Sequence, residues 1–130
     1  MVPKFRTWNG YRNIMADYVS AIQNGDTQGT PSSVNVIVNG KNETWDIKND
    51  HVELLQYTGL KDASDDEIYE NDLVSLDLDD TPYQVIFDEG KFELSNDYLR
   101  LVYDLSEEHM DCEIIGNVHT NPELLEAHHE

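Results

Sequence analysis

The segment LLQYTGLKDASDDEIYENDLVSL, residues 54–76, places a dense run of carboxylates between two apolar flanks: Asp62, Asp65, Asp66, Glu67, Glu70 and Asp72. Such a run is compatible with a metal loop, a catalytic pair, a surface for basic partners or a solvated turn. Tyr57-Thr58-Gly59 would end a helix early, which favours a strand before the acids. We therefore predict a hairpin, with a charged turn at 63–66, a short return strand through Ile68-Tyr69 and a bend at Asn71.

The residues before this segment contain a second and clearer hairpin signal. In VNVIVNGKNETWDI, residues 34–47, valines alternate up to Asn39-Gly40, the preferred pair for a two-residue type I′ turn. With that turn, Val34 lies opposite Trp45 as a cross-strand pair. A first strand is predicted over residues 4–8, and the polar segment 23–33 is predicted to be a mobile loop.

The second half of the chain alternates apolar and polar residues with a period of two. Residues 72–79, 83–88 and 91–94 are separated by turn residues, which predicts a three-stranded meander with one acidic, wet face. Residues 98–111 are ambiguous between strand and helical turn, and 112–120 read as a final strand. Asn121 as N-cap and Pro122 at the first helical position predict a short C-terminal helix.

These elements predict one all-β domain over residues 1–130, with a minor short helix at its C-terminus. A chain of 130 residues fits a single domain of common size and is long enough to bury a core without disulfides or structural metal. Many short strands with tight turns favour a small barrel or sandwich.

The chain is strongly acidic, with 8 Lys and Arg residues against 27 Asp and Glu residues and a formal net charge of −19. Residues 1–50 are balanced, so the excess lies in residues 51–130, where Lys61, Lys91 and Arg100 are the basic side chains. Such a surface repels nucleic-acid phosphate and anionic membranes, while it allows attraction to a basic protein. We expect no direct nucleic-acid binding and no membrane binding. The alternative is that the charge only keeps the protein soluble.

Cysteine usage and the N-terminal sequence favour a cytoplasmic protein. Cys112 is the single cysteine, so an intrachain disulfide is impossible. The first ten residues, MVPKFRTWNG, lack the apolar core and cleavage site of a secretory signal.

The sequence contains only incomplete versions of two metal-binding motifs. An EF-hand beginning at Asp62 would be satisfied by Ser64 and Asp66, but Glu67 stands where the loop requires Gly and Leu73 where it requires Glu. His109-x2-Cys112, with His119 further along, supplies only half of one zinc-ligand pair. We expect no metal and no cofactor.

Motifs for catalysis also fail. The carboxylates cluster in turns and on the polar face of strands, where they stay exposed and ionised rather than paired across a cleft. No phosphate-binding loop, nucleophile elbow or dinucleotide fingerprint is present in the sequence. We therefore expect no catalytic residues.

Three segments together resemble the signature of the YopX-like family of phage and prophage proteins. They are KFRTW at the N-terminus, LLQYTGLKDASDDEIYENDLV at residues 54–74 and CEIIGNVHTNPELLE at residues 112–126. They cover about a third of the chain in the family's order. The resemblance implies an SH3-like, bifurcated pseudo-barrel of short antiparallel strands encoded in a bacterial or prophage genome, and it implies no activity.

The matching positions are interpreted as framework rather than as a site. They include Gln56, Tyr57, Gly59, Leu60, Asp62, Glu67, Ile68, Tyr69, Asp72, Gly116, Asn117, Asn121 and Pro122. The sequence departs from the family at two turns. Asp65-Asp66 replaces Asn-Gly, which predicts a turn longer or looser than in relatives, and Asn71 replaces a Gly, where Asn still tolerates a positive φ.

Three functional hypotheses follow. The first is a non-enzymatic interaction module that binds a host or phage protein through an acidic face, with Asp65, Asp66, Asp77 and Asp79 as its candidate residues. The second is an acidic DNA mimic that inhibits a host nuclease or another nucleic-acid-binding protein. The third and weakest is a hydrolase that uses His119 and a nearby acid.

Overall fold

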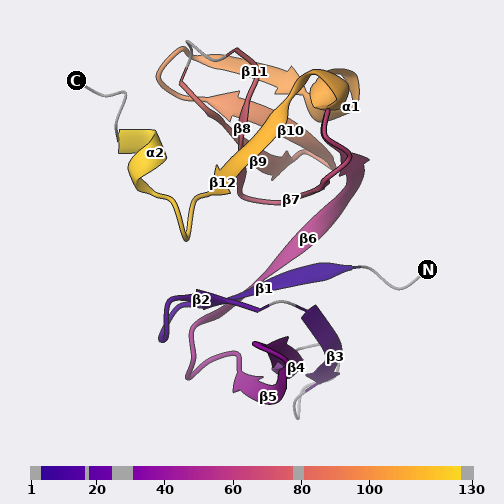
Figure 1. The fold of residues 1–130 in the computed structure, drawn as a ribbon, viewed down its shortest axis with the longest axis vertical. Helices are drawn as coiled ribbons and strands as arrows, with labels where there is room; N and C mark the ends of the chain where they lie inside the picture. Colours follow the sequence, from indigo (N-terminus) through magenta and orange to yellow (C-terminus); the bar gives the residue numbers. More distant parts are fainter. Residues whose placement is uncertain (1–3, 17, 25–30, 78–80, 127–130) are drawn as a thin grey trace. The chain divides into compact units, whose positions relative to one another are not determined.

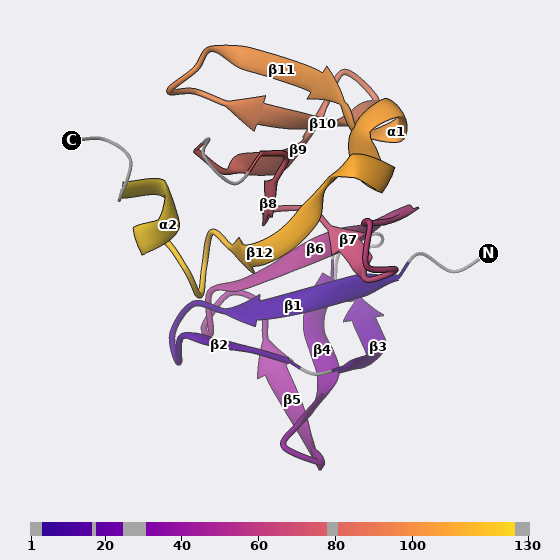
Figure 2. The same cartoon turned by 45° about the horizontal axis from the view of Figure 1, so that its top comes forward.

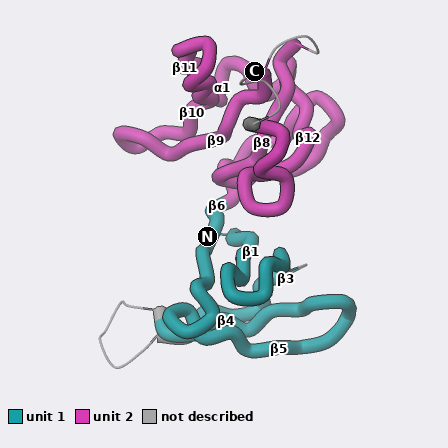
Figure 3. Tube along the Cα trace, turned by 90° about the vertical axis from the view of Figure 1, so that its left-hand side faces the viewer, with its two compact units in different colours: residues 1–56 teal, residues 57–130 magenta. Residues whose placement is uncertain are grey.

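The computed structural model describes residues 4–16, 18–24, 31–77 and 81–126. The chain forms two compact units, residues 1–56 and 57–130, which are described separately (Figure 3). In chain order (Figure 1) the elements are β1 (Phe5–Asn9), β2 (Ile14–Met15), β3 (Tyr18–Asn24), β4 (Pro31–Val38), β5 (Lys41–Asp46), β6 (Val52–Lys61), β7 (Glu67–Tyr69), β8 (Asp72–Ser75), β9 (Tyr83–Asp88), β10 (Lys91–Asn96), β11 (Leu101–Asp104), α1 (Leu105–Glu108), η1 (His109–Asp111), β12 (Glu113–Asn117) and α2 (Glu123–Glu126).

The all-β prediction is confirmed, because strands dominate both units and the antiparallel sheets are curled as in a half-barrel. The predicted C-terminal helix is present as α2. The segment that the sequence left ambiguous divides between the two alternatives, with β11 followed by the helical turns α1 and η1. Whether the two units act as one domain stays a prediction.

The first unit contains the predicted hairpin in the predicted register. β4 pairs with β5 so that Val34 lies opposite Trp45 and Val38 opposite Lys41. Asn39 and Gly40 both have positive φ, 52° and 78°, as a type I′ turn requires. The turn chemistry therefore sets which side chains of this hairpin face inward.

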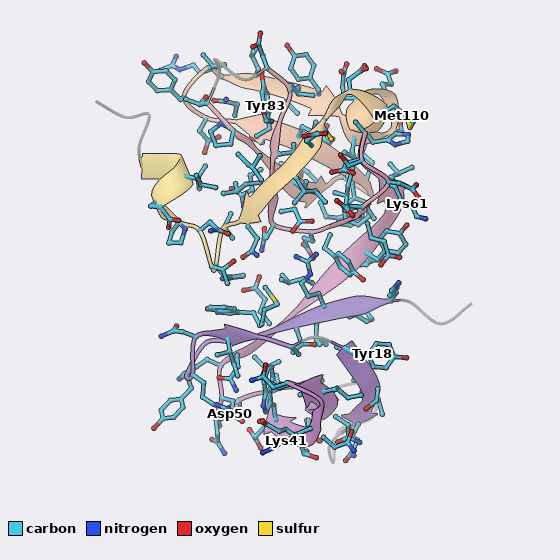
Figure 4. The ribbon with its side chains drawn as sticks, viewed as in Figure 1. Tyr18, Lys41, Asp50, Lys61, Tyr83 and Met110 are labelled. Carbon is cyan, nitrogen blue, oxygen red and sulfur yellow. The ribbon has the colours of Figure 1, made fainter. Side chains whose placement is uncertain are left out.

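The core of the first unit forms between this hairpin and the strands around it. Val34, Val36 and Trp45 are almost fully buried and pack with Ala16 and Val38. β3 pairs with β4, and β1 pairs with both β2 and the first part of β6. Tyr18, by contrast, projects from β3 into solvent (Figure 4).

Strand pairing extends into both ends of the segment expected to be a loop. Residues 23–24 belong to β3, residues 31–33 belong to β4, and Ser33 pairs with Gln23. Residues 25–30 lie outside the described residues, so the mobile loop stays a prediction there.

β6 is shared by the two units along its length. Gln56 pairs with Phe5 of β1, whereas the next residue, Tyr57, pairs with Tyr69 of β7. Between the Tyr57 and Lys61 pairs the register shifts, and Gly59 has a φ of 85°. A β-bulge at a left-handed glycine explains why the strand bends here without ending.

The second unit contains a five-stranded antiparallel sheet in the order β11-β10-β9-β8-β12, whose strands follow one another across a curled surface (Figure 2). β8, β9 and β10 form the predicted meander. Glu89 and Gly90 have φ of 51° and 83°, so the turn between β9 and β10 has the same form as Asn39-Gly40.

The core of the second unit is a cluster of buried side chains from this sheet, from β7 and from the helical turn after β11. Its buried members are Ile68, Val74, Tyr83, Val85, Leu94, Leu105 and Cys112. Leu105 is the first residue of α1, so the helical turn supplies one of the core side chains. Asp104 begins that helix by accepting the backbone N–H of Ser106 at 3.0 Å.

Candidate interaction surface

The acidic run divides into buried and exposed carboxylates. Asp62 and Asp72 are 3% and 0% exposed, whereas Asp65 and Asp66 lie in the open turn before β7. The interpretation of the whole run as a solvated turn was therefore wrong for two of its members. These two acids face backbone donors rather than water, which the composition of the run does not reveal.

Asp62 organises the turn through its carboxylate. Oδ1 accepts the backbone N–H groups of Ser64 at 3.0 Å and Asp66 at 2.9 Å. Oδ2 accepts the N–H of Ile114 at 2.9 Å, which connects the turn to β12. Three charge-assisted hydrogen bonds explain how the carboxylate is tolerated inside the protein.

The turn lies where it was predicted, between β6 and β7. Asp62 N–H donates to Asp66 C=O at 2.9 Å, and Asp65 N–H donates to Asp62 C=O at 3.0 Å. Asp65 has a φ of 68°, a conformation that Asp adopts more readily than most residues. These bonds and the Asp62 carboxylate hold the turn, and a turn longer or looser than in relatives stays a prediction.

The bend before β8 is held by Asn71 and Asp72. Asn71 has a φ of 69°, as expected where the family has a glycine, and its Oδ1 accepts a hydrogen bond from Gln84 Nε2 at 3.1 Å. Its backbone N–H donates to Val85 and its C=O accepts from Val118. Asp72 Oδ2 accepts the Tyr69 N–H at 2.8 Å, which closes the corner between β7 and β8.

The C-terminal signature forms a second braced turn. A Cβ at Gly116 would lie 2.6 Å from Asn121 Oδ1, so glycine is required there by close approach. Asn121 Oδ1 accepts the Asn117 N–H at 3.2 Å, and Asn117 Oδ1 accepts the N–H of His119 at 3.0 Å and of Thr120 at 2.9 Å. The Asn121 side chain thus points back to the turn rather than capping α2. Pro122 directly precedes α2.

Most remaining signature residues also have structural roles. Tyr57 and Tyr69 pack with ring centroids 5.4 Å apart, Ile68 is fully buried, and Leu60 packs against the core. Glu67 is paired with Lys61 at the start of β7. Gln56 is exposed on β6, so its burial does not indicate a role in the fold.

The candidate acidic face is drawn from two separate turns. Asp65 and Asp66 precede β7, and Asp77 follows β8; all three are exposed. Asp79 lies outside the described residues. Lys61 Nζ lies 3.8 Å from Asp65, a contact between exposed groups that contributes little.

The wider environment of this face is strongly negative. Residues 57–130 carry 21 Asp and Glu residues against 3 Lys and Arg residues, a net charge of −18, while residues 1–56 carry 6 against 5, a net charge of −1. The electrostatic field that a charged partner meets is therefore that of the second unit.

The histidine and cysteine side chains of the described residues do not converge on a metal site. His109 Nδ1 lies 2.7 Å from the Lys61 carbonyl, and Cys112 Sγ lies 3.4 Å from the His109 carbonyl. Burial raises the pKa of the Cys112 thiol to about 11, with a further contribution from the nearby Asp62 carboxylate. A thiol of that pKa is a poor nucleophile and a poor metal ligand at neutral pH.

In the described part of the chain, no group of three or more His, Cys, Asp or Glu side chains is arranged to hold a metal ion. A small pocket in the second unit is lined by Thr81, Pro82, Gln84, Ser95, Asn96, Asp97, Tyr98 and Leu125. Among the described residues its lining contains one carboxylate and neither histidine nor cysteine, so His119 is not part of it. None of the helices among the described residues has the length and apolar character needed to cross a membrane.

The curled sheets and the two braced turns define a small β protein whose signature residues serve the fold. The family model described as YopX protein matches residues 4–126, and the chain belongs to this family. The match spans both compact units, so the family signature is not confined to one of them.

Two solved structures resemble this one. The crystal structure of protein EF1440 from Enterococcus faecalis is 26% identical, with a TM-score of 0.69 over 96% of this chain and 99% of that chain. The crystal structure of protein yopX from Bacillus subtilis is 22% identical, with a TM-score of 0.61 over 93% and 96%. A search of curated proteins gave no match. The second likeness supports the fold alone.

Proposed function

We propose that this protein is a non-enzymatic interaction module of phage or prophage origin that binds a basic protein in the bacterial cytoplasm. One observation supports it above the others: the charge of −18 in residues 57–130, with Asp65, Asp66 and Asp77 exposed. Fields of this size raise association rates with a partner of opposite charge. The phage or prophage origin rests on the family resemblance.

The same charge disfavours other classes of partner. A polyanion such as DNA or RNA would meet repulsion at every carboxylate, and so would an anionic lipid surface. A protein with clustered Lys or Arg gains from the same field, and the specificity then comes from the shape of the contact. A basic protein is the partner class that fits.

The side chains that catalysis would require either have an unsuitable pKa or are engaged in hydrogen bonds that hold the fold. The Cys112 thiol has a raised pKa, and the buried carboxylates of Asp62 and Asp72 accept backbone hydrogen bonds. A general acid or nucleophile needs a pKa near the working pH and access to substrate. These residues support the non-enzymatic proposal.

The test is affinity capture from a bacterial host lysate with the native chain and with a variant carrying Asp65→Asn, Asp66→Asn and Asp77→Asn. We expect the native chain to retain one specific protein with a basic surface and the variant to retain much less. Recovery of only abundant basic proteins, all released together by moderate salt, would contradict the proposal. A captured DNA-binding protein whose activity is inhibited would assign the acidic face to mimicry of DNA.

A further inference from the structure

β11 is an apolar strand at the end of the sheet in the second unit. Among the strands of the described residues it pairs with β10 alone. Leu101, Val102 and Tyr103 are 37%, 56% and 36% exposed, and the strand contains neither Lys nor Pro. Sheet edges of natural proteins are usually protected by such residues or by a covering segment, because an open edge pairs with other strands.

The edge strand at the other end of the same sheet, β12, forms hydrogen bonds with a segment outside the sheet, and in this respect it differs, within the described residues, from β11. At β12 the Ile114 N–H donates to Asp62 Oδ2, and the Cys112 C=O accepts from Ala63. The turn after β6 therefore occupies the edge of β12 that does not pair with β8. The side-chain contacts of β11 are with strands of the same sheet, since the rings of Tyr103 and Tyr83 lie 5.7 Å apart and Lys91 Nζ lies 3.7 Å from Asp104.

The register shows which side chains of β11 would meet an added strand on each face. Tyr103 lies opposite the fully buried Leu94, and Leu101 lies opposite the buried Asn96, so both are on the core side of the sheet. They stay partly exposed because the sheet ends beside them. One more strand carrying apolar side chains on this face would cover them.

The opposite face of β11 differs in chemistry. Asp104 lies opposite Glu93, and Val102 lies opposite Ser95. An added strand would present its alternate side chains next to Asp104, in a unit of net charge −18, where Asp104 and Glu93 share one cation, Lys91 Nζ, at 3.7 Å from each. Lys or Arg at those positions would be attracted, whereas a second copy of this chain would bring another acidic unit and be repelled.

We propose that β11 is a docking edge for an extended segment of a protein partner in which apolar residues alternate with Lys or Arg. The segment adds to the sheet beside β11, with backbone hydrogen bonds giving affinity and the alternating side chains giving specificity. This inference rests on the proposed function, because it names the surface and the sequence pattern by which the basic partner is held.

The experiment uses the full chain, labelled with ¹⁵N, and three capped peptides of about eight residues, the length of a long strand. In the first peptide Val alternates with Lys. The second has a central Pro with the same charge, so strand pairing is blocked, and the third has Glu in place of Lys. Amide shifts of the protein report where each peptide binds.

We expect the Val/Lys peptide to shift the amides of residues 101–104, the Pro peptide to bind at least about tenfold more weakly, and the Glu peptide not to bind. Leu101→Ser should weaken binding of the Val/Lys peptide, while Ile115→Ser, which changes an exposed aliphatic side chain on β12, should leave it unchanged. Both variants must keep the native amide spectrum elsewhere, which excludes unfolding as the cause.

Several results would overturn the inference. Equal binding of the Val/Lys and Pro peptides, with shifts centred on Asp65, Asp66 and Asp77, would assign binding to charge alone, and the proposed function would survive. Shifts at 101–104 that grow with protein concentration in the absence of peptide would assign the edge to a second copy. Failure of all basic peptides together with failure of affinity capture would remove the proposed function as well.

Discussion

The Asp62 carboxylate accepts the backbone N–H of Ile114 at 2.9 Å across 52 residues of sequence. This hydrogen bond joins the acidic turn to the last strand of the sheet. It shows that carboxylates with similar sequence surroundings have different roles, since Asp62 serves the fold while Asp65 and Asp66 face solvent.

Removing the Asp62 side chain should be strongly destabilising. Asp62→Ala leaves three backbone donors without partners, and we expect the free energy of unfolding to fall by about 3–5 kcal/mol. Asp62→Asn keeps Oδ1 but places an amide against the Ile114 N–H, so we expect a loss of about 1–3 kcal/mol. Urea unfolding measures both. Asp66→Asn, in the exposed part of the turn, is the control and should change stability by less than about 0.5 kcal/mol.

Gly116 and Asn121 should behave as a coupled pair. Gly116→Ala places a methyl group 2.6 Å from Asn121 Oδ1, and the overpacking should cost about 1–3 kcal/mol. In the Asn121→Ala background Oδ1 and Cγ are removed and only the Cβ at 3.0 Å remains, so the same change at Gly116 should cost less. A double-mutant cycle of unfolding free energies gives the coupling. Additive losses would show that the close approach is not what requires glycine.

Two threonines with different surroundings should respond oppositely to Val. Within the described residues Thr7 Oγ1 is buried with no hydrogen-bond partner, whereas Thr58 Oγ1 donates to the Ile68 carbonyl at 2.8 Å. Thr7→Val removes an unsatisfied polar atom, and we expect it to stabilise by about 1 kcal/mol. Thr58→Val should destabilise by about 1 kcal/mol or more, because it also removes the acceptor for Leu60 N–H. Thermal unfolding of both variants provides the measurement, and equal effects would contradict the assignment.

The Cys112 thiol should be unreactive toward alkylating reagents in the native protein at neutral pH. Its pKa is raised to about 11 from an ordinary value of 9.0, and its side chain is buried. Alkylation by iodoacetamide at pH 8 should therefore proceed only as fast as the protein unfolds, measured by the mass increase with time. Rapid alkylation without denaturant would contradict the burial.

The same thiol gives a pH dependence of stability. Because the folded pKa is higher than the unfolded one, the unfolded state loses its proton first as pH rises. The contribution of the protonated Cys112 thiol to the free energy of unfolding is fully present below about pH 9. It is lost as the pH rises toward 11. Cys112→Ala lacks the group and should show a shallower alkaline decline in the free energy of unfolding. Identical slopes for the two proteins would exclude this source.

Local turn chemistry was the part of the fold that the sequence predicted best. The Asn39-Gly40 hairpin, its Val34–Trp45 pair and the left-handed Asn71 follow from residues adjacent in the chain, and all are confirmed. The helical turn α1 was left undecided, although Asp104 followed by Glu107 is the spacing of a capping box and could have indicated it.

The roles of the individual carboxylates were harder to predict from the sequence, for a physical reason. The burial of Asp62 depends on a donor 52 residues away, and nothing in the local pattern distinguishes it from its neighbours except the Asp-x-Ser-x-Asp spacing that supports a side-chain-braced turn. The edge position of β11 likewise depends on the order of strands in the sheet rather than on its own residues. Long-range pairing therefore decides which residues are framework and which are surface.

The central claim is that exposed carboxylates bind a basic partner while buried ones hold the fold. The most direct measurement compares Asp62→Asn with the variant carrying Asp65→Asn, Asp66→Asn and Asp77→Asn, by urea unfolding and by titration calorimetry with the captured partner. We predict that the triple variant keeps native stability and binds at least about tenfold more weakly, and that Asp62→Asn loses stability but binds normally where it is folded. A triple variant that binds the partner as tightly as the native chain would contradict the account.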